Sequence, residues 1–186
     1  MIMGVERLVE LARFIENKEL REKTIEILRD IKLTHPRFQK LEREDPDNVK
    51  TPFAINDVIV LRDLIVHTAT VTETCMKIAE VIEKNYGIKV NRDVLISGAL
   101  LHDIMKVYEF KDGKHSGILL DHSALGFAEL YKREFPEEVL HLVISHAAPS
   151  TNPPKTLEAL ILHYVDTLLA LVEFGVLSNM LGREEK

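Results

Sequence analysis

The stretch Ala99-Leu100-Leu101-His102-Asp103-Ile104-Met105-Lys106 places a histidine beside an aspartate at the end of an apolar run. Adjacent residues on a helix point about 100° apart, so this pair shares a partner only where several helices converge. Metal sites inside helical bundles are built in this way, from side chains on facing helices. Lys106 follows His102 by four residues, so we expect it to project on the same side. These polar groups among leucines need a partner for their charge, and a divalent cation is one such partner.

Composition bounds the fold class and the compartment. The chain has 186 residues, 6% of them aromatic and none of them tryptophan, which favours a single all-α domain over a sandwich or a barrel. Its one cysteine, Cys75, cannot form an internal disulfide, and the N-terminus lacks a signal-peptide pattern. The apolar residues 157–181 are interrupted by His163, Asp166 and Glu173, so we expect no membrane span. A soluble, cytoplasmic protein is predicted.

The charge distribution argues against a general nucleic-acid binder. The formal net charge is −6, and residues 1–50 contain eleven Lys and Arg against eleven Asp and Glu, so the whole excess lies in residues 51–186. A nucleic-acid binder would normally show a basic stripe, and none is visible. An acidic body suits a small substrate that is handled by a metal ion, because the cation supplies the local positive charge.

The first 56 residues are expected to form helices and a linker. Residues 4–32 have the apolar spacing of one broken or two short amphipathic helices. Residues 33–56 contain three prolines and a charged cluster, which indicates a long loop. A long helix is then predicted from Asp57, as its cap, to about Tyr86. Its inward stripe has a 4-3-4-4-3-4 spacing and comprises Val60, Leu64, His67, Val71, Cys75, Ile78 and Ile82.

Each later element is expected to bring one or two ligand-type side chains inward. A helix capped by Asn91 leads to His102, and residues 107–117 centre on an Asp-Gly pair that predicts a small two-stranded flap. Three further helices follow, the first opening at His122, the second starting at Pro136 and the third starting at Thr156. Proline residues 149, 153 and 154 predict a rigid loop before the last of these helices. The second helix contributes His146 and the third contributes Asp166.

These inward polar residues together favour a metal site. One inward histidine is more often a core residue satisfied by its neighbours, but polar residues on five separate inward faces are hard to satisfy in pairs. A mixed set of histidines and carboxylates suits Mn, Fe, Zn, Co or Ni, and six ligands can hold one or two ions. The candidate ligands are His67, His102, Asp103, His122, His146 and Asp166.

The ordered set resembles the H…HD…H…H…D signature of the HD-domain metal-dependent phosphohydrolases, although Met105 stands where a glycine is common. The resemblance covers residues 57–175, so residues 57–186 are predicted to form an all-α HD domain with the flap, and residues 1–56 to pack on it. It implies that His67, His102, Asp103 and Asp166 hold one metal. It further implies that His122, His146 and a bridging Asp103 hold a second metal.

The activity implied by this resemblance is metal-dependent phosphoester hydrolysis. A bound metal lowers the pKa of water from about 15.7 toward 7, which provides hydroxide at neutral pH. The two-metal ligand set favours a phosphodiesterase over a monophosphatase, acting on a nucleotide or a cyclic phosphoester. Asp103 and Lys106 are the candidate catalytic residues, Lys106 as a phosphate contact. Similar family members open cyclic phosphates, including a pterin cyclic phosphate, or split dinucleotide polyphosphates.

Two alternatives stay open at this point, a diiron oxygenase of the same superfamily and a non-catalytic metal-containing module that binds a nucleotide. Homo-oligomerisation also stays open. Among the other histidines, His115 is expected to be exposed. His163 is expected either to orient Asp166 or to be a core residue satisfied by the backbone.

Overall fold

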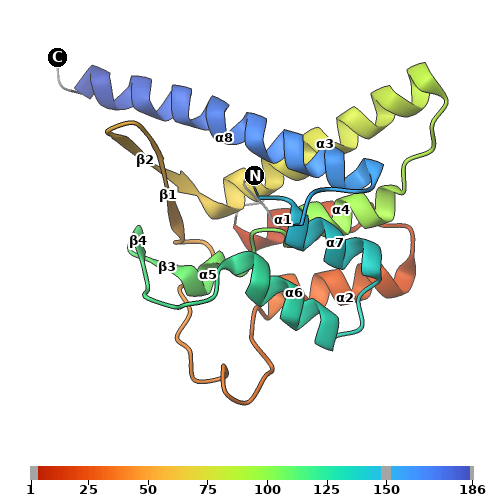
Figure 1. Ribbon diagram of the computed structural model, residues 1–186, viewed down its shortest axis with the longest axis horizontal. Coiled ribbons are helices and arrows are strands. Elements are labelled where there is room, and N and C mark those ends of the chain that lie inside the picture. Colours follow the sequence, from red (N-terminus) through yellow and green to blue (C-terminus); the bar gives the residue numbers. More distant parts are fainter. Residues whose placement is uncertain (1–3, 148–151, 185–186) are drawn as a thin grey trace.

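The computed structural model describes residues 4–147 and 152–184, and helices form most of this part of the chain (Figure 1). The helices are α1 (Val5–Ala12), α2 (Lys18–Arg29), α3 (Leu64–Tyr86), α4 (Arg92–Leu101), α5 (Lys106–Glu109), α6 (His122–Lys132), α7 (Glu137–Ser145) and α8 (Leu157–Glu184). Two antiparallel hairpins are formed by β1 (Lys50–Ile55) with β2 (Val58–Asp63), and by β3 (Phe110–Lys111) with β4 (Lys114–His115). The all-α fold class with a small flap is confirmed.

Helix α4 is the centre of the core. Residues 94–101 are all buried, and the helix contacts α2, α3, α7 and α8. The sequence explains this position, because Asn91 caps the helix and only apolar or small side chains follow from Val94 onward. The predicted start of this helix is confirmed. Because other helices surround α4, the residues that follow its C-terminal end at Leu101 lie in the middle of the bundle.

The N-terminal helices share this core. Residues 4–32 form two short helices, as predicted, and Leu8, Leu28 and Ile31 belong to the same buried cluster as α4. Asn17 caps α2 by accepting a hydrogen bond from the Leu20 amide. Within the core, the hydroxyl groups of Thr24 and Ser97 lie 2.9 Å apart and satisfy each other.

The prediction of a long loop over residues 33–56, followed by a helix from Asp57, is wrong at its C-terminal end. Residues 50–63 form the β1–β2 hairpin instead, with Phe53 opposite Val60 and a turn at Asn56, whose φ is 53°. The run Val58-Ile59-Val60-Leu61 is rich in β-branched residues, and burial alternates from Ile59 to Arg62, which suits a strand. Helix α3 starts only at Leu64, where the Asp63 side chain accepts a hydrogen bond from the Val66 amide.

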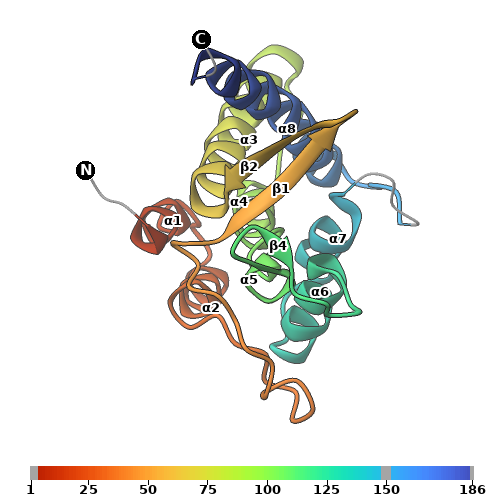
Figure 2. The ribbon, with the colours of Figure 1, turned by 90° about the vertical axis from the view of Figure 1, so that its left-hand side faces the viewer.

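The predicted flap is confirmed. Strands β3 and β4 are joined by Asp112 and Gly113, whose φ values of 49° and 71° fit a tight hairpin turn. A Cβ placed on Gly113 would lie 3.2 Å from the Leu61 side chain of β2. The two hairpins therefore touch, and they lie on the same side of the bundle in Figure 2.

Helix α8 is long and has an apolar outer face. Its segment Leu157–Met180 is long and apolar enough to cross a membrane by length and composition, and 22% of its most apolar window is buried. Asp166 and Glu173 nevertheless turn inward and contact His67, which ties the middle of the helix to the protein interior. Of the three prolines expected in the preceding loop, Pro153 and Pro154 lie in irregular chain, and Pro149 lies outside the described residues.

The packing of α4 on α7 gives a first prediction. A Cβ on Gly98 would lie 2.8 Å from the Cβ of Leu142, so Gly98→Ala should lower the free energy of unfolding by about 1–3 kcal/mol. The matched control is Gly175→Ala in α8, where a Cβ would meet nothing within 4 Å and should stabilise the helix by about 0.5–1 kcal/mol. Denaturant unfolding of both variants measures this difference, and equal effects would contradict the close contact.

Candidate metal centre

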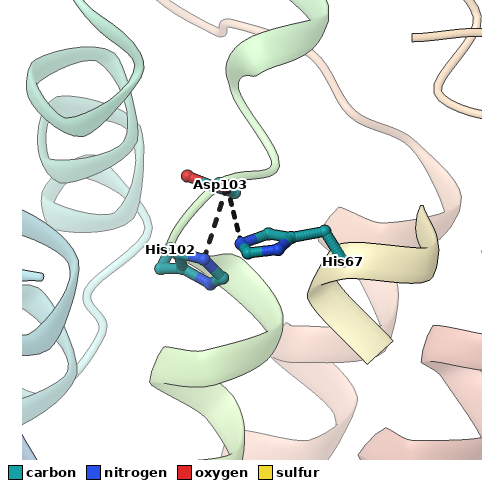
Figure 3. A group of neighbouring side chains, drawn as sticks. All are labelled: His67, His102 and Asp103. Carbon is teal, nitrogen blue, oxygen red and sulfur yellow. Dashed lines mark ion pairs between the residues drawn. The ribbon is translucent and has the colours of Figure 1, made fainter. Parts of the chain in front are cut away.

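Five of the six candidate ligands lie at helix ends, which meet in one place beside Asp166 in α8. His67 is in the first turn of α3, His102 and Asp103 directly follow α4, and His122 is the first residue of α6. His146 directly follows α7, and Asp166 lies on α8. Figure 3 shows the imidazoles of His67 and His102 next to each other, each joined to Asp103 by a dashed line that marks an ion pair. The structure thus brings together all six side chains that the sequence singled out, from five helices.

Asp103 lies at the centre of this group. Its Oδ2 atom is 3.7 Å from Nε2 of His67 and 3.4 Å from Nε2 of His102. Its Oδ1 atom is 3.2 Å from Nε2 of His122 and 3.4 Å from Nε2 of His146. Each carboxylate oxygen therefore faces a different pair of histidines, which is the arrangement of a bridging carboxylate.

Asp166 completes the first of these two groups. Its Oδ1 atom lies 2.9 Å from Nε2 of His67 and 3.9 Å from Nε2 of His102. The first donor set is therefore His67, His102, Asp103 and Asp166, and the second is Asp103, His122 and His146. Donor atoms from His67, His102 and Asp103, and likewise from the second set, lie within 4.8 Å of one another.

All four imidazoles have the same orientation relative to the centre of the group. In each ring Nδ1 contacts an acceptor oxygen, and Nε2 is the nitrogen that points to the centre. The acceptors are a carboxylate for His67 (Glu173, 2.9 Å) and His122 (Glu109, 2.6 Å), and a backbone carbonyl for His102 (Ala99, 2.7 Å) and His146 (Val143, 2.7 Å). An Nδ1–H that donates outward fixes the tautomer in which Nε2 carries the lone pair for a metal.

Two of these acceptors were missed from the sequence. Glu173 lies seven residues after Asp166, so helical periodicity places both on one face of α8 and could have identified it. Glu109 reaches His122 across the flap, and no spacing rule indicates such a contact. His163 donates from Nδ1 to the His146 carbonyl at 2.8 Å, which matches the alternative of a histidine satisfied by the backbone. The side chain of His115 is half exposed, as expected.

The placement of Lys106 differs from the helical expectation. The chain leaves the helix after Leu101 and resumes as α5 at Lys106, so Lys106 is not one turn along the same helix as His102. Its Nζ atom lies 2.6 Å from Oδ2 of Asp103, and the residue is buried. Lys106 therefore faces the bridging carboxylate itself.

Comparison with known proteins identifies the family. The HD domain model matches residues 64–171, which include all six candidate ligands. The chain belongs to the HD-domain family. It is 42% identical over 172 residues to the dihydroneopterin 2',3'-cyclic phosphate phosphodiesterase of Methanocaldococcus jannaschii, an alignment that covers 87% of this chain and 67% of that relative. No solved structure matches the chain.

HD domains bind divalent metals, and the donor set of this one fits such an ion. Nε2 of His102 and Oδ1 of Asp103 are buried and have no hydrogen-bond partner among the described residues. Buried polar atoms without a partner are costly, and a cation between them would satisfy both. Imidazole nitrogens mixed with carboxylate oxygens suit Mn, Fe, Co, Ni or Zn, whereas Mg and Ca prefer oxygen ligands alone.

The pKa shifts at the candidate metal centre also favour a bound cation. Burial would raise the pKa of Asp103, but the charges of His102 and Lys106 hold it well below its usual value. Burial would lower the pKa of His67, but hydrogen bonds with Asp166 and Glu173 outweigh it and raise this pKa to about 9. Burial lowers the pKa of His146. Without a metal, the protonated ring of His67 is balanced by Asp166 and Glu173, which contact its two nitrogens.

This balance makes metal binding depend on pH. His67 is protonated at neutral pH because its pKa is about 9, and it must lose the Nε2 proton to bind an ion. Raising the pH from 7 to 9 removes this competition, so the apparent metal affinity should rise about tenfold per pH unit for each proton displaced and level off above pH 9. Calorimetry of the metal-free chain in buffers of different ionisation enthalpy counts the protons. An affinity that stays constant from pH 7 to 9 would contradict this assignment.

Proposed function

We propose that this HD domain is a metal-dependent phosphodiesterase whose metal ligands are His67, His102, Asp103, His122, His146 and Asp166. The observation that carries the proposal is the pair of donor sets that share Asp103, each carboxylate oxygen facing its own two histidines. The activity of the M. jannaschii relative, a phosphodiesterase, supports the same reaction class. Residues 57–186 carry all six ligands, so we assign the catalytic domain to them.

The chemistry of this site follows from its donors. When bound, divalent ions supply hydroxide at neutral pH and place positive charge near phosphoryl oxygens. The protein contributes fixed imidazoles, since each ring is held at Nδ1, and a carboxylate shared by the two donor sets. With two sets in one centre, we assign the site two ions of the Fe, Mn, Co, Ni or Zn group.

Lys106 is the proposed phosphate contact. Its ammonium group is buried beside Asp103, close to both donor sets. A positive charge that is already in place attracts the phosphoryl oxygens of the substrate and stabilises the negative charge that accumulates on them in the transition state. The role of Lys106 is therefore to bind and stabilise the phosphoryl group, while Asp103 holds the ions.

The proposed substrate is a small cyclic phosphoester. The relative acts on a 2',3'-cyclic phosphate of dihydroneopterin, and its alignment with this chain extends over most of the sequence. We therefore propose that this chain opens a 2',3'-cyclic phosphate carried on the polyol side chain of a pterin. The acidic body, with a net charge of −6, agrees with an anionic substrate only if bound cations attract it, which the metal centre provides.

Turnover of cyclic phosphates tests this function. With Mn or Fe present, the chain should open dihydroneopterin 2',3'-cyclic phosphate, while 3',5'-cyclic nucleotides and phosphomonoesters should react far more slowly. Asp103→Asn should lower kcat/KM on the order of 10³-fold, because the bridging charge is lost. Glu80→Gln, at an exposed carboxylate paired with Lys77, is the matched control and should leave turnover unchanged. Oxygen consumption by the iron-loaded chain without phosphoester cleavage would instead support the diiron oxygenase.

Replacement of Lys106 tests its role separately. Lys106→Met should lower kcat about 10²-fold while the bound metal remains, because one preorganised positive charge is lost from the transition state. Lys111→Met in the exposed flap is the control for loss of a lysine charge and should change kcat little. An unchanged kcat in Lys106→Met would remove Lys106 from the catalytic machinery and leave the metal site intact.

A further inference from the structure

We propose that Arg62 of β2 and Glu173 of α8 form a positioning pair that fixes His67 for its ion and so couples the β1–β2 hairpin to the metal centre. This proposal rests on the proposed role of His67 as a metal ligand. It also gives a function to a hairpin that the sequence did not predict and to a buried arginine that the catalytic assignment does not use.

The contacts from Arg62 through Glu173 to His67 form a relay. Its first contact is between Glu173 and His67. Oε2 of Glu173 lies 2.9 Å from Nδ1 of His67, while Oδ1 of Asp166 lies 2.9 Å from Nε2 of the same ring. Two carboxylates on one face of α8 therefore contact the two nitrogens of one imidazole. Because Nδ1–H donates to Glu173, Nε2 keeps its lone pair for the ion, and the carboxylate increases the basicity of the ring.

The second contact is between Arg62 and Glu173. Nη1 of Arg62 lies 3.7 Å from Oε2 of Glu173, and the guanidinium carbon lies 4.9 Å from the centre of the Phe53 ring. Arg62 is 7% exposed, and its Nε and Nη1 atoms have no hydrogen-bond partner among the described residues. Burying a guanidinium without hydrogen-bond partners at these atoms is costly. This cost indicates that the charge of Arg62 has a role beside Glu173.

The charge of Arg62 faces the acceptor of His67. Nη1 of Arg62 and Nδ1 of His67 both approach Oε2 of Glu173, at 3.7 and 2.9 Å. The guanidinium therefore holds this carboxylate in the position from which it accepts the Nδ1–H of His67.

The local sequence explains why a hairpin carries this arginine. Arg62 alternates with Leu61 along β2, so Arg62 turns toward α8 while Leu61 stays half exposed. The next residue, Asp63, caps α3, and His67 follows within the first turn of that helix. The end of β2 therefore sets both the start of the ligand helix and the position of the arginine. Figure 2 shows the hairpin lying across α8.

The flap offers a natural contrast. Glu109 holds His122 in the same way as Glu173 holds His67, but the side chain behind Glu109 is His115, which is 51% exposed and whose Nε2 lies 3.9 Å from Oε1 of Glu109. An exposed side chain at this distance contributes little. The buried relay should therefore matter at the His67 donor set, and the exposed one should matter much less at the His122 set.

Calorimetric Mn²⁺ titration of the metal-free full chain tests the relay. A His122→Ala background leaves the His67 donor set as the complete one and simplifies the isotherm. In it, Arg62→Met and Glu173→Gln should each weaken Mn²⁺ binding about 10- to 100-fold. The double variant should be no weaker than Glu173→Gln alone, because both changes break one relay, and Arg62→Lys should recover part of the affinity.

Thermal unfolding of the metal-free chain separates positioning from mere stability. Arg62→Met replaces a buried, incompletely paired cation by an apolar side chain, so its midpoint should stay equal or rise while the Mn²⁺ affinity falls. His115→Gln and Arg92→Met are the matched controls, the latter at an exposed arginine paired with Glu83, and both should bind Mn²⁺ normally.

Two results would overturn the relay. One is Mn²⁺ affinity in Arg62→Met within twofold of the unsubstituted background, and the other is additive losses in the double variant. In either case, phosphodiesterase turnover by the unmodified chain would show that the proposed function stands without the relay. An unmodified chain that binds no Mn²⁺ would instead remove the proposed function together with it.

Discussion

The structure depends on the burial of one carboxylate. Asp103 is 1% exposed, and an ionised group at this depth is stable only where positive charge or hydrogen-bond donors surround it. The ammonium group of Lys106 meets part of that need, and a metal ion between Asp103 and the four imidazoles would meet the rest. The ends of the surrounding helices direct their polar side chains toward this carboxylate, so the candidate metal centre lies inside the core of the bundle.

Helix ends are suited to this arrangement. A side chain in mid-helix shares its face with neighbours a turn away, whereas a residue at a helix end can face an opening where several axes converge. His102 and His146 directly follow α4 and α7, and each donates from Nδ1 to a carbonyl three residues back, in its own last turn. The backbone carbonyls at these C-terminal helix ends would otherwise lack a hydrogen-bond donor. By accepting from Nδ1, they also fix the direction of each ring.

The sequence predicted most of the fold and all six of the candidate ligand side chains that the structure brings together. Helical spacing identified the inward stripe at His67, and the ordered histidines and aspartates identified the family, because both signals are local or strongly patterned. The β1–β2 hairpin was missed because Val60 and Leu64 fit a four-residue helical spacing as well as a strand. The contact of Lys106 with Asp103 was missed because the helix breaks after Leu101. Glu109 reaches His122 through tertiary packing, which no spacing rule records.

The two inward carboxylates of α8 restrict the length of that helix more than its composition. Asp166 and Glu173 are two turns apart and contact opposite nitrogens of His67. One extra residue between them would rotate the second carboxylate by about 100° about the helix axis and remove it from the ring. The outer face carries no charged residue from position 160 to 180 and can change its side chains without this penalty. Natural variants of this helix must therefore keep the spacing of seven residues from Asp166 to Glu173.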